Sequence, residues 1–341
     1  MDDATPWLER LEALGFAIQR HLARPAGTAD EERARPEGHE GGDQIFGIDR
    51  EVEPVLLAEI AVWPEEAGPL ALVAEGLGAD GRLTLGDPRR PPRYRLIVDP
   101  IDGSRGLMYD KRSAWFIAAV APERGPATSL LDTFASVLVE LPTRKQEWCD
   151  SYAAAAGEPA RGRRVRVGGL DPRPLPPRPS GASDLRFGFA QVANYFPGTK
   201  VLASELMERI VAATLGEVRS GEALVFDDQY ISSGGQMAEL IAGHDRFTCD
   251  LRPLFHQILE GRGGKTARGV ECHPYDVAGA LVARQAGVVI TDGFGRPLDA
   301  PLDVSTGVHW CGYANAAIRA LVEPVIGRWL AEQGIGPDEP E

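Results

Sequence analysis

The sequence predicts a mixed α and β fold whose helices and strands alternate along the chain, and three observations carry this prediction. Apolar residues recur at helical spacing in residues 7–22. Short apolar runs of the kind that form buried strands follow at residues 69–76 and at residues 96–98, and the second run is rich in β-branched residues. A chain of 341 residues with 43% hydrophobic residues can bury one large core or two medium ones.

The elements of the first half follow from the spacing of their apolar residues. Residues 7–22 are expected to form an amphipathic helix that ends by Pro25. Residues 25–43 are rich in Gly, Pro and charge, which is typical of a surface loop rather than of a core element. A second helix should follow, with its regular part beginning near Pro54 because proline fits best in a first helical turn. Further strands are expected at residues 115–120 and 136–140.

A proline-rich stretch at residues 171–181 interrupts this pattern. Because proline cannot donate to a strand ladder, we expect the wider segment 160–182 to be a linker or surface insertion outside any sheet interior. A boundary here separates an N-terminal α+β part, residues 1–180, from a C-terminal α/β part, residues 181–341. In the second part we expect a strand at residues 185–191 and helices at residues 201–215 and 236–242.

The most informative local pattern is an apolar strand that runs into two carboxylates, Arg-Leu-Ile-Val-Asp-Pro-Ile-Asp-Gly-Ser, ending at Ser104. Pro100 is expected to end the strand ladder, so that Asp99 and Asp102 lie at a strand end, where they can hold a metal. Gly103 permits a close backbone approach, and Ser104 adds a hydroxyl beside backbone N–H groups that can face an anion. An aspartate-rich turn after a core strand is the alternative interpretation.

A second pattern lies near the C-terminus. His-Pro-Tyr-Asp, ending at Asp276, precedes a run of small and apolar residues, as expected at the start of a buried helix. Residues 288–290 then have the composition of a strand, and a turn with Asp-Gly follows. Taken alone, Asp276 fits a cap of this helix, which is the commoner role of a lone aspartate.

Acidic residues upstream fit the same scheme. An apolar strand ends on Glu75, whereas Glu65 and Glu66 precede that strand and are expected to be solvated. Further upstream, Asp43 and Asp49 stand at the two ends of the segment Asp-Gln-Ile-Phe-Gly-Ile-Asp.

These patterns resemble those of the inositol monophosphatase and fructose-1,6-bisphosphatase superfamily. Asp-Pro-Ile-Asp-Gly-Ser is similar to the superfamily's first signature, and Tyr-Asp-Val-Ala-Gly-Ala is similar to its second, with Tyr275 in place of the usual tryptophan. Glu75 matches a metal-binding glutamate at the end of a strand. Asp-Gln-Ile-Phe-Gly-Ile-Asp is similar to a third segment, although Phe46 replaces the usual threonine. The resemblance covers residues 40–325, and the two signatures occur in the superfamily's order.

The resemblance implies a layered α-β-α-β-α sandwich, hydrolysis of a phosphate monoester, and a homodimer. It also implies that two or three Mg²⁺ ions are bound by acidic side chains and one main-chain carbonyl, supplied by Glu75, Asp99, Ile101 (the carbonyl), Asp102 and Asp276. Mg²⁺ prefers oxygen ligands of this kind. Asp43 and Asp49 correspond to positions on a mobile loop that helps to hold a loosely bound ion.

The remaining site roles also follow from the resemblance. Ser104 stands where a threonine is common and, with Glu75 and Asp49, makes up the expected catalytic set that orients and deprotonates the attacking water. Ser233 precedes an expected helix, and a plain N-cap is its alternative role. The expected substrate-binding residues are Gly103, Ser104, Arg105, Ser233 and Glu271.

A small phosphorylated metabolite is the implied substrate, with a sugar phosphate or inositol phosphate as first choice. Arg105 is similar to the basic residue that follows the first signature in 3'-phosphoadenosine-5'-phosphate phosphatases, so a nucleotide stays an alternative, as does fructose 1,6-bisphosphate. A catalytically silent relative would be marked by loss of a metal ligand, and all four principal acids are present. A dinucleotide-binding oxidoreductase is disfavoured because no Gly-x-Gly-x-x-Gly follows a strand.

Composition predicts a cytoplasmic protein without a nucleic-acid or membrane partner. A net charge of −14 disfavours nucleic-acid binding, which needs a basic face. No run of about 18 apolar residues is present to span a bilayer, and the N-terminal Met-Asp-Asp offers acid where a signal peptide has a basic region. The cysteines form no Cys-x-x-Cys pair, so we expect reduced core thiols rather than zinc ligands or disulfides.

Overall fold

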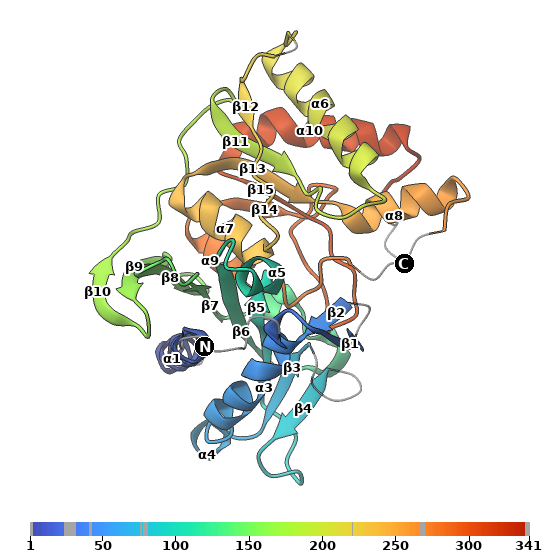
Figure 1. Cartoon of the computed structure of the whole chain (residues 1–341). Coiled ribbons are helices and arrows are strands. Elements are labelled where there is room, and N and C mark those ends of the chain that lie inside the picture. Colours follow the sequence, from blue (N-terminus) through green and yellow to red (C-terminus); the bar gives the residue numbers. More distant parts are fainter. Residues whose placement is uncertain are drawn as a thin grey trace.

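The described residues form two large β-sheets between three layers of helices, arranged as α-β-α-β-α, and a separate two-stranded sheet (Figure 1). The structure, a computed structural model, describes residues 3–23, 32–40, 43–75, 77, 81–219, 221–265 and 270–337, and the side chains of residues 39, 40 and 43–45 lie outside this description. The predicted layered sandwich is confirmed.

The first sheet has eight strands in the order β10-β9-β8-β7-β6-β5-β3-β4. Their bounds are β3 (Leu70–Ala74), β4 (Arg82–Leu85), β5 (Tyr94–Asp102), β6 (Ala114–Pro122), β7 (Ala135–Leu141), β8 (Trp148–Ala155), β9 (Arg161–Arg166) and β10 (Leu170–Pro174). All neighbours are antiparallel except β3 and β5, which run parallel and pair up to Ala74 opposite Val98. Glu75 and Asp99 follow this last pair, so they lie at the same end of the two parallel strands.

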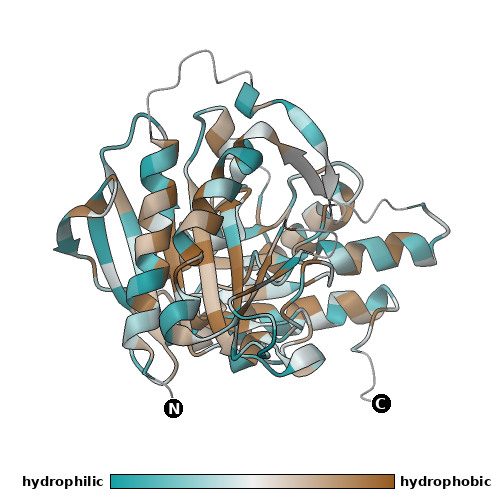
Figure 2. Ribbon diagram, turned by 90° about the horizontal axis from the view of Figure 1, so that it is seen from below, coloured by the Kyte–Doolittle hydropathy of each residue, from teal (hydrophilic) through white to brown (hydrophobic). Residues whose placement is uncertain are grey.

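One face of this sheet is covered by α1 (Thr5–Leu22) and α3 (Gly47–Ile60). The apolar stripe of α1 packs against strands that are buried on both faces, which explains their continuous apolar sequence. Seen from below, these strands are mostly brown behind helices that alternate between brown and teal (Figure 2). The short α4 (Pro64–Ala67) and the hairpin of β1 (Pro36–Glu40) and β2 (Asp43–Phe46) complete this side.

The middle layer consists of α7 (Ser233–Ala242) and α9 (Ala280–Gln285), which share one apolar core with both sheets. The second sheet has the order β12-β11-β13-β15-β14. Its strands are β11 (Gly188–Val192), β12 (Val225–Phe226), β13 (Asp245–Asp250), β14 (Val289–Thr291) and β15 (Trp310–Tyr313). The outer face of this sheet packs against α6 (Lys200–Leu215), α8 (Arg252–Gly261) and α10 (Ala316–Glu332).

Two expectations based on proline are wrong. β5 does not end at Pro100 but continues to Asp102, because Pro100 lies within a bulge, where its missing N–H is tolerated. The helix expected to become regular near Pro54 already begins at Gly47. Its first turn is capped instead by Asp49, whose Oδ2 accepts a hydrogen bond from the Phe46 N–H at 2.8 Å.

The segments expected to be loop or insertion also contain strands. Within residues 25–43, the described part includes β1, which pairs with β2. Within residues 160–182, β9 and β10 extend the first sheet, and β10 is its fully exposed edge strand, a position that accepts proline. The chain passes to the second sheet between Pro174 and Gly188, and the expected boundary falls in this connection.

The helix near the C-terminal signature begins later than expected. Residues 274–279 form successive turns, in which Asp276 N–H donates to the His273 carbonyl at 3.1 Å and Ala280 N–H donates to the Val277 carbonyl at 2.9 Å. α9 starts only at Ala280. The tight turns leave Asp276 ahead of the helix rather than within its first turn.

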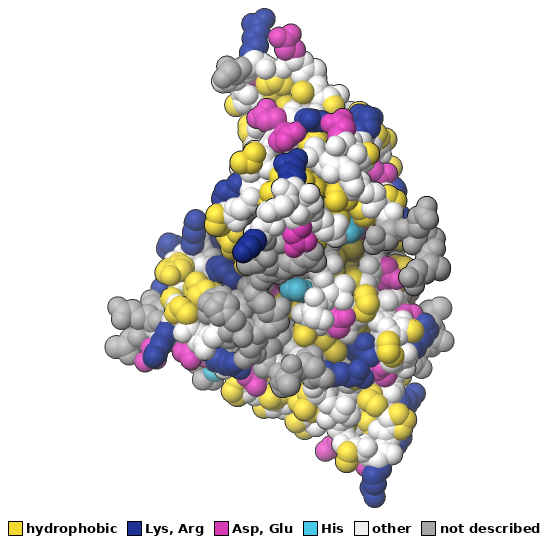
Figure 3. Space-filling model, turned by 90° about the vertical axis from the view of Figure 1, so that its right-hand side faces the viewer, with side chains coloured by type: hydrophobic (Ala, Val, Ile, Leu, Met, Phe, Trp, Pro, Cys, Tyr) yellow, Lys and Arg dark blue, Asp and Glu magenta, His cyan; other side chains and the backbone are white. Residues whose placement is uncertain are grey.

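Other expected helices and strands, and the expected free thiols, agree with the structure. The predicted helices at 201–215 and 236–242 correspond to α6 and α7, and the strands at 115–120 and 136–140 to β6 and β7. All four cysteines are buried free thiols. None of the helices in the described residues combines the length and hydrophobicity that crossing a bilayer requires. Among the coloured residues in Figure 3, basic and acidic side chains are interspersed over the face that is shown.

Packing of α1 on the first sheet should carry a large share of the stability. Leu11 of α1 is fully buried in the core that α1 shares with α3 and the first sheet. Leu11→Ala is therefore expected to lower the free energy of unfolding by about 2–5 kcal/mol, because it removes buried methyl groups and leaves a cavity. Leu131→Ala is the matched control, since Leu131 is 52% exposed. Equal urea midpoints for the two variants would contradict this account of the core.

Candidate active site

A bulge in β5 brings two carboxylates to the same side of the first sheet. Asp99 pairs with Ile117 of β6, and Asp102 pairs with Trp115, so β5 contains one more residue than β6 between the two pairs. In a regular strand, residues three apart point to opposite faces. The extra residue cancels this alternation, and Asp99 and Asp102 both face α7 and the C-terminal half.

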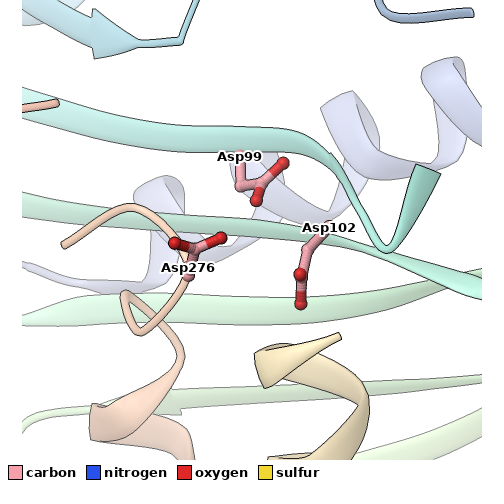
Figure 4. Close-up of side chains that lie close together, drawn as sticks. All are labelled: Asp99, Asp102 and Asp276. Atoms are coloured by element: carbon pink, nitrogen blue, oxygen red, sulfur yellow. The ribbon is translucent and has the colours of Figure 1, made fainter. Parts of the chain in front are cut away.

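Asp276 reaches the same point from the turns before α9. One carboxylate oxygen from each of Asp99, Asp102 and Asp276 lies within 4.8 Å of those of the other two. Figure 4 shows the three side chains converging from β5 and from the loop that precedes α9. Asp99 and Asp102 are buried, whereas Asp276 is partly exposed. The convergence predicted from two distant parts of the sequence is therefore present.

Hydrogen bonds from α7 hold Asp102 in place. Its Oδ2 accepts from the Ser232 hydroxyl at 2.8 Å and from the Gly234 N–H at 2.6 Å. Ser232 is also the N-cap of α7, because its Oγ accepts from the Gly235 N–H at 2.8 Å. Gly103 allows this approach: its φ is +94°, and a Cβ there would lie 2.9 Å from the Ile231 carbonyl. These hydrogen bonds fix the start of α7 against the end of β5.

The other two aspartates are positioned by the backbone around them. Asp99 Oδ1 accepts from the Ile101 N–H at 3.0 Å, across the bulge. Asp276 Oδ2 accepts from the His273 N–H at 2.6 Å, so this side chain stabilises its own turn as well as joining the cluster. The two roles considered for Asp276 are compatible, since a carboxylate has two oxygens.

When no cation is bound, the surroundings of Asp99 and Asp102 favour the protonated form of their carboxyl groups. Burial, together with the negative charges of Asp102, Asp276 and Glu75, raises the pKa of Asp99 well above its usual value. Burial and the charge of Asp276 raise the pKa of Asp102 to about 8, although hydrogen bonds from Ser232 and Gly234 oppose the shift. Neighbouring carboxylates are the main charges acting on both groups.

All of the expected site residues except Asp43 line one pocket around this cluster. Besides the three aspartates, the lining contains the expected metal, catalytic and substrate-binding residues Asp49, Glu75, Ile101, Gly103, Ser104, Arg105, Ser233 and Glu271. Glu75 follows the last residue of β3, and its charge acts on Asp99. Asp43 begins β2, but its side chain lies outside the described residues.

The pocket also contains residues that the sequence did not single out. Ser232, rather than Ser233, supplies the side-chain hydroxyl that contacts Asp102. Ser233 is the first residue of α7, and its Oγ lies 3.6 Å from Cys272 Sγ. Tyr195, Phe196 and Arg252 line the pocket from the second half of the chain. The Ser-Ser-Gly-Gly pattern before α7 offered an N-cap signal for Ser232, whereas no local pattern marks the other three.

The donor set fits a hard divalent cation. Three carboxylates converge, and the hydrogen bonds described above engage one oxygen each of Asp99 and Asp102. A bound cation would favour the charged forms of Asp99 and Asp102, whose pKa values are raised by burial and by the neighbouring carboxylates. Oxygen ligands without thiolate or imidazole suit Mg²⁺ rather than zinc or copper.

Comparison with solved structures identifies the fold. Similar structures include SuhB, an extragenic suppressor protein of Bartonella henselae (17% identity, TM-score 0.61, 94% of this chain and 98% of that chain). They also include holo fructose-1,6-bisphosphatase of Leishmania major (14%, 0.65, 95% and 95%) and inositol monophosphatase of Anabaena (17%, 0.55, 96% and 96%). No protein-family model and no curated protein sequence matches the chain. The chain therefore has the fold of the inositol monophosphatase and fructose-1,6-bisphosphatase superfamily, as the sequence resemblance implied.

The raised pKa of Asp102 predicts an unusual dependence of stability on pH. Its pKa is about 8 in the folded protein against an ordinary value of 3.8. Between these values the folded state holds a proton that the unfolded chain releases, so without metal the stability should fall as the pH rises. Urea unfolding in EDTA should give a higher free energy at about pH 5 than at about pH 8.

Asp102→Asn is the matched test, because the substitution keeps the shape and removes the titrating group. The variant should show a smaller loss of stability over the same pH range and should exceed the parent near pH 8. Identical pH profiles for variant and parent would show that Asp102 is ionised in the folded protein.

Proposed function

We propose that the protein hydrolyses the phosphate monoester of a small phosphorylated metabolite in a reaction that requires a divalent cation, which we take to be Mg²⁺. The observation that carries this proposal is the convergence of Asp99, Asp102 and Asp276 in a pocket within this fold. Structures of inositol monophosphatases and fructose-1,6-bisphosphatases share the fold, which supports the choice of reaction.

The acidic residues would hold the cation, and their neighbours would handle the substrate and the water. Asp99, Asp102 and Asp276 are the proposed ligands, with Glu75 and the Ile101 carbonyl beside them. A bound divalent cation neutralises phosphate charge and makes a coordinated water more acidic. Without it, the cluster would repel a phosphate, because its charges have the same sign.

Ser104 and Glu75 are the proposed pair for proton transfer. Ser104 opens α5 (Ser104–Met108) directly after the bulged segment of β5, and both residues line the pocket. In this proposal the Ser104 hydroxyl orients the attacking water and passes its proton towards the Glu75 carboxylate.

A sugar phosphate or an inositol phosphate is the first choice of substrate. Glu271 lines the pocket, and its Oε1 lies 2.6 Å from His256 Nδ1. This contact fixes the carboxylate while leaving its second oxygen for another partner. We assign Glu271 to a hydroxyl group of the substrate, because a carboxylate accepts hydrogen bonds from polyols.

A nucleotide is the second candidate, and the aromatic lining favours it. Tyr195 and Phe196 lie on the pocket wall, and the Arg105 guanidinium lies 5.3 Å from the centre of the Phe196 ring. Aromatic and guanidinium planes are suitable surfaces for a base. A phosphate-release screen over sugar, inositol and nucleotide phosphates, with and without Mg²⁺, tests both candidates. Absence of Mg²⁺-dependent release from every compound would contradict the proposed function.

Asp99→Asn should abolish Mg²⁺-dependent phosphate release while the protein remains folded. The amide keeps the size of the side chain but removes the charge that attracts the cation. Without metal, thermal stability should equal or exceed that of the parent, because repulsion within the cluster falls. Asp171→Asn, at an exposed position outside the pocket, is the matched control. If Asp99→Asn keeps activity within a few-fold of Asp171→Asn, the ligand assignment is wrong.

Two substitutions at Ser104 test whether its hydroxyl takes part in the reaction or whether the residue only forms the turn. Ser104→Ala should lower kcat by roughly 10² to 10⁴, the usual contribution of general acid–base catalysis. Ser104→Thr retains a hydroxyl and should stay near the parent. Metal affinity should be similar in both variants, as measured by calorimetry. Equal turnover of the two variants would exclude the hydroxyl from the mechanism.

A further inference from the structure

A second cavity lies on the first sheet, apart from the acidic pocket. It is a groove of about 340 Å³ between the strands β6 to β9 and the C-terminal end of α7. No residue that lines this groove also lines the pocket around Asp99, Asp102 and Asp276. The two cavities are therefore separate.

The groove is lined by a buried tyrosine whose hydroxyl the fold does not use. Tyr152 of β8 is only 2% exposed, and its hydroxyl forms no hydrogen bond with any of the described residues. Burial is the main cause of the raised pKa of this phenol, and the charges of Asp150, Arg164 and Glu140, which all line the groove, also act on it. The hydroxyl therefore stays uncharged and lies among the groove residues. Because buried polar groups nearly always have hydrogen-bond partners, it is available to a group that enters the groove.

A carboxylate on the same wall has no cationic partner. Glu140 of β7 accepts hydrogen bonds from Gln146 Nε2 at 2.8 Å and from the Asp150 N–H at 2.9 Å. No Lys, Arg or His side chain in the part of the chain that the structure describes forms an ion pair with it. Burial raises the pKa of the Glu140 carboxyl, although the hydrogen bonds from Asp150 and Gln146 oppose the shift. A cation in the groove would favour the charged form of this group.

The other two carboxylates that line the groove are already paired. Arg164 donates to both oxygens of Asp150, at 2.6 and 2.9 Å. Glu239 accepts a hydrogen bond from Arg112 Nη2 at 3.1 Å, and its second oxygen contacts the His244 ring. With these two acids paired, the third leaves the groove with a net negative charge.

Aromatic rings supply the apolar part of the wall. The rings of Trp115 and Tyr152 are stacked, with their centres 6.4 Å apart. Trp148 also lines the groove, and the Arg173 guanidinium lies 4.0 Å from the centre of its ring. Aromatic faces attract cations, and this wall already holds one guanidinium group of the chain.

We propose that this groove is a binding site for a small organic cation, an alkyl ammonium or an alkyl guanidinium. The N–H groups of the cation donate to the Glu140 carboxylate and to the Tyr152 hydroxyl, and its apolar stem packs on the aromatic rings. Both cations share this chemistry, and the volume of the groove suits a small molecule. The site is distinct from the substrate pocket and does not depend on the proposed phosphatase function.

Calorimetry with three probes that share one stem tests the site. The probes are n-butylammonium, n-butylguanidinium and uncharged n-butanol, and Mg²⁺ is included so that it competes with them for the acidic cluster. At least one cation should bind with one site per chain and about ten-fold or more tightly than n-butanol, as expected for hydrogen bonds to a charged group. The tighter cation identifies the charged group that the site prefers. Equal binding of cations and n-butanol, or no cation binding at millimolar concentrations, would overturn the proposal.

Two variants assign the binding to the groove. Tyr152→Phe removes only the hydroxyl, so its thermal midpoint should stay near that of the parent while cation binding weakens several-fold. Glu140→Gln should weaken cation binding about ten-fold or more, because it removes the unpaired charge. Glu66→Gln is the matched control, since this side chain on α4 is 78% exposed, and it should bind the cation as the parent does.

Asp99→Asn distinguishes the groove from the acidic cluster. This variant should bind the cation as tightly as the parent, because Asp99 lies outside the groove. Loss of binding in Asp99→Asn, with binding retained in Glu140→Gln, would place the cation at the cluster and overturn the proposal. If Glu140→Gln does not fold, Tyr152→Phe decides the outcome, and binding equal to that of the parent would contradict the site. None of these measurements uses phosphate release, so the proposed function is tested separately.

Discussion

The repulsion among Asp99, Asp102 and Asp276 is the constraint on which the rest of the site depends. Two of these carboxylates, Asp99 and Asp102, are buried, and their burial and the neighbouring carboxylates raise their pKa values. A fold whose only requirement was stability would gain from replacing them with apolar residues, because buried charges are costly without a partner of opposite sign. A bound divalent cation would offset the free-energy cost of burying these like charges close together. This would account for the hydrogen bonds that hold the carboxylates in place.

The layered fold supplies the geometry for that convergence. The parallel pairing of β3 and β5 places Glu75 and Asp99 at the same sheet edge, and the bulge in β5 turns Asp102 towards α7. Ser232 then connects the start of α7 to Asp102. Because α7 and α9 lie between the sheets, the cluster draws on both halves of the chain. The same arrangement places Arg252, the first residue of α8, in the wall of the pocket.

Local chemistry made part of this site predictable from sequence. Asp99, Asp102 and Asp276 lie in short sequence patterns that are typical of metal ligands. Their convergence could therefore be predicted before the structure was known. The bulge at Pro100 could not, because it depends on the register of β5 against β6, which is a tertiary property. Arg252 and Phe196 also escaped prediction, since only the packing of distant segments places them beside the cluster. The hairpin of β1 and β2 was mistaken for loop because glycine, proline and charge dominate its local sequence.

Anomalous diffraction from crystals grown with Mn²⁺ as a substitute for Mg²⁺ tests the central claim most directly, because it locates the cation without requiring a substrate. The account predicts an anomalous peak at coordination distance, about 2.0–2.3 Å, from carboxylate oxygens of Asp99, Asp102 and Asp276. Protein crystals that diffract well and show no peak between these three side chains, at a Mn²⁺ concentration far above that of the protein, would contradict it.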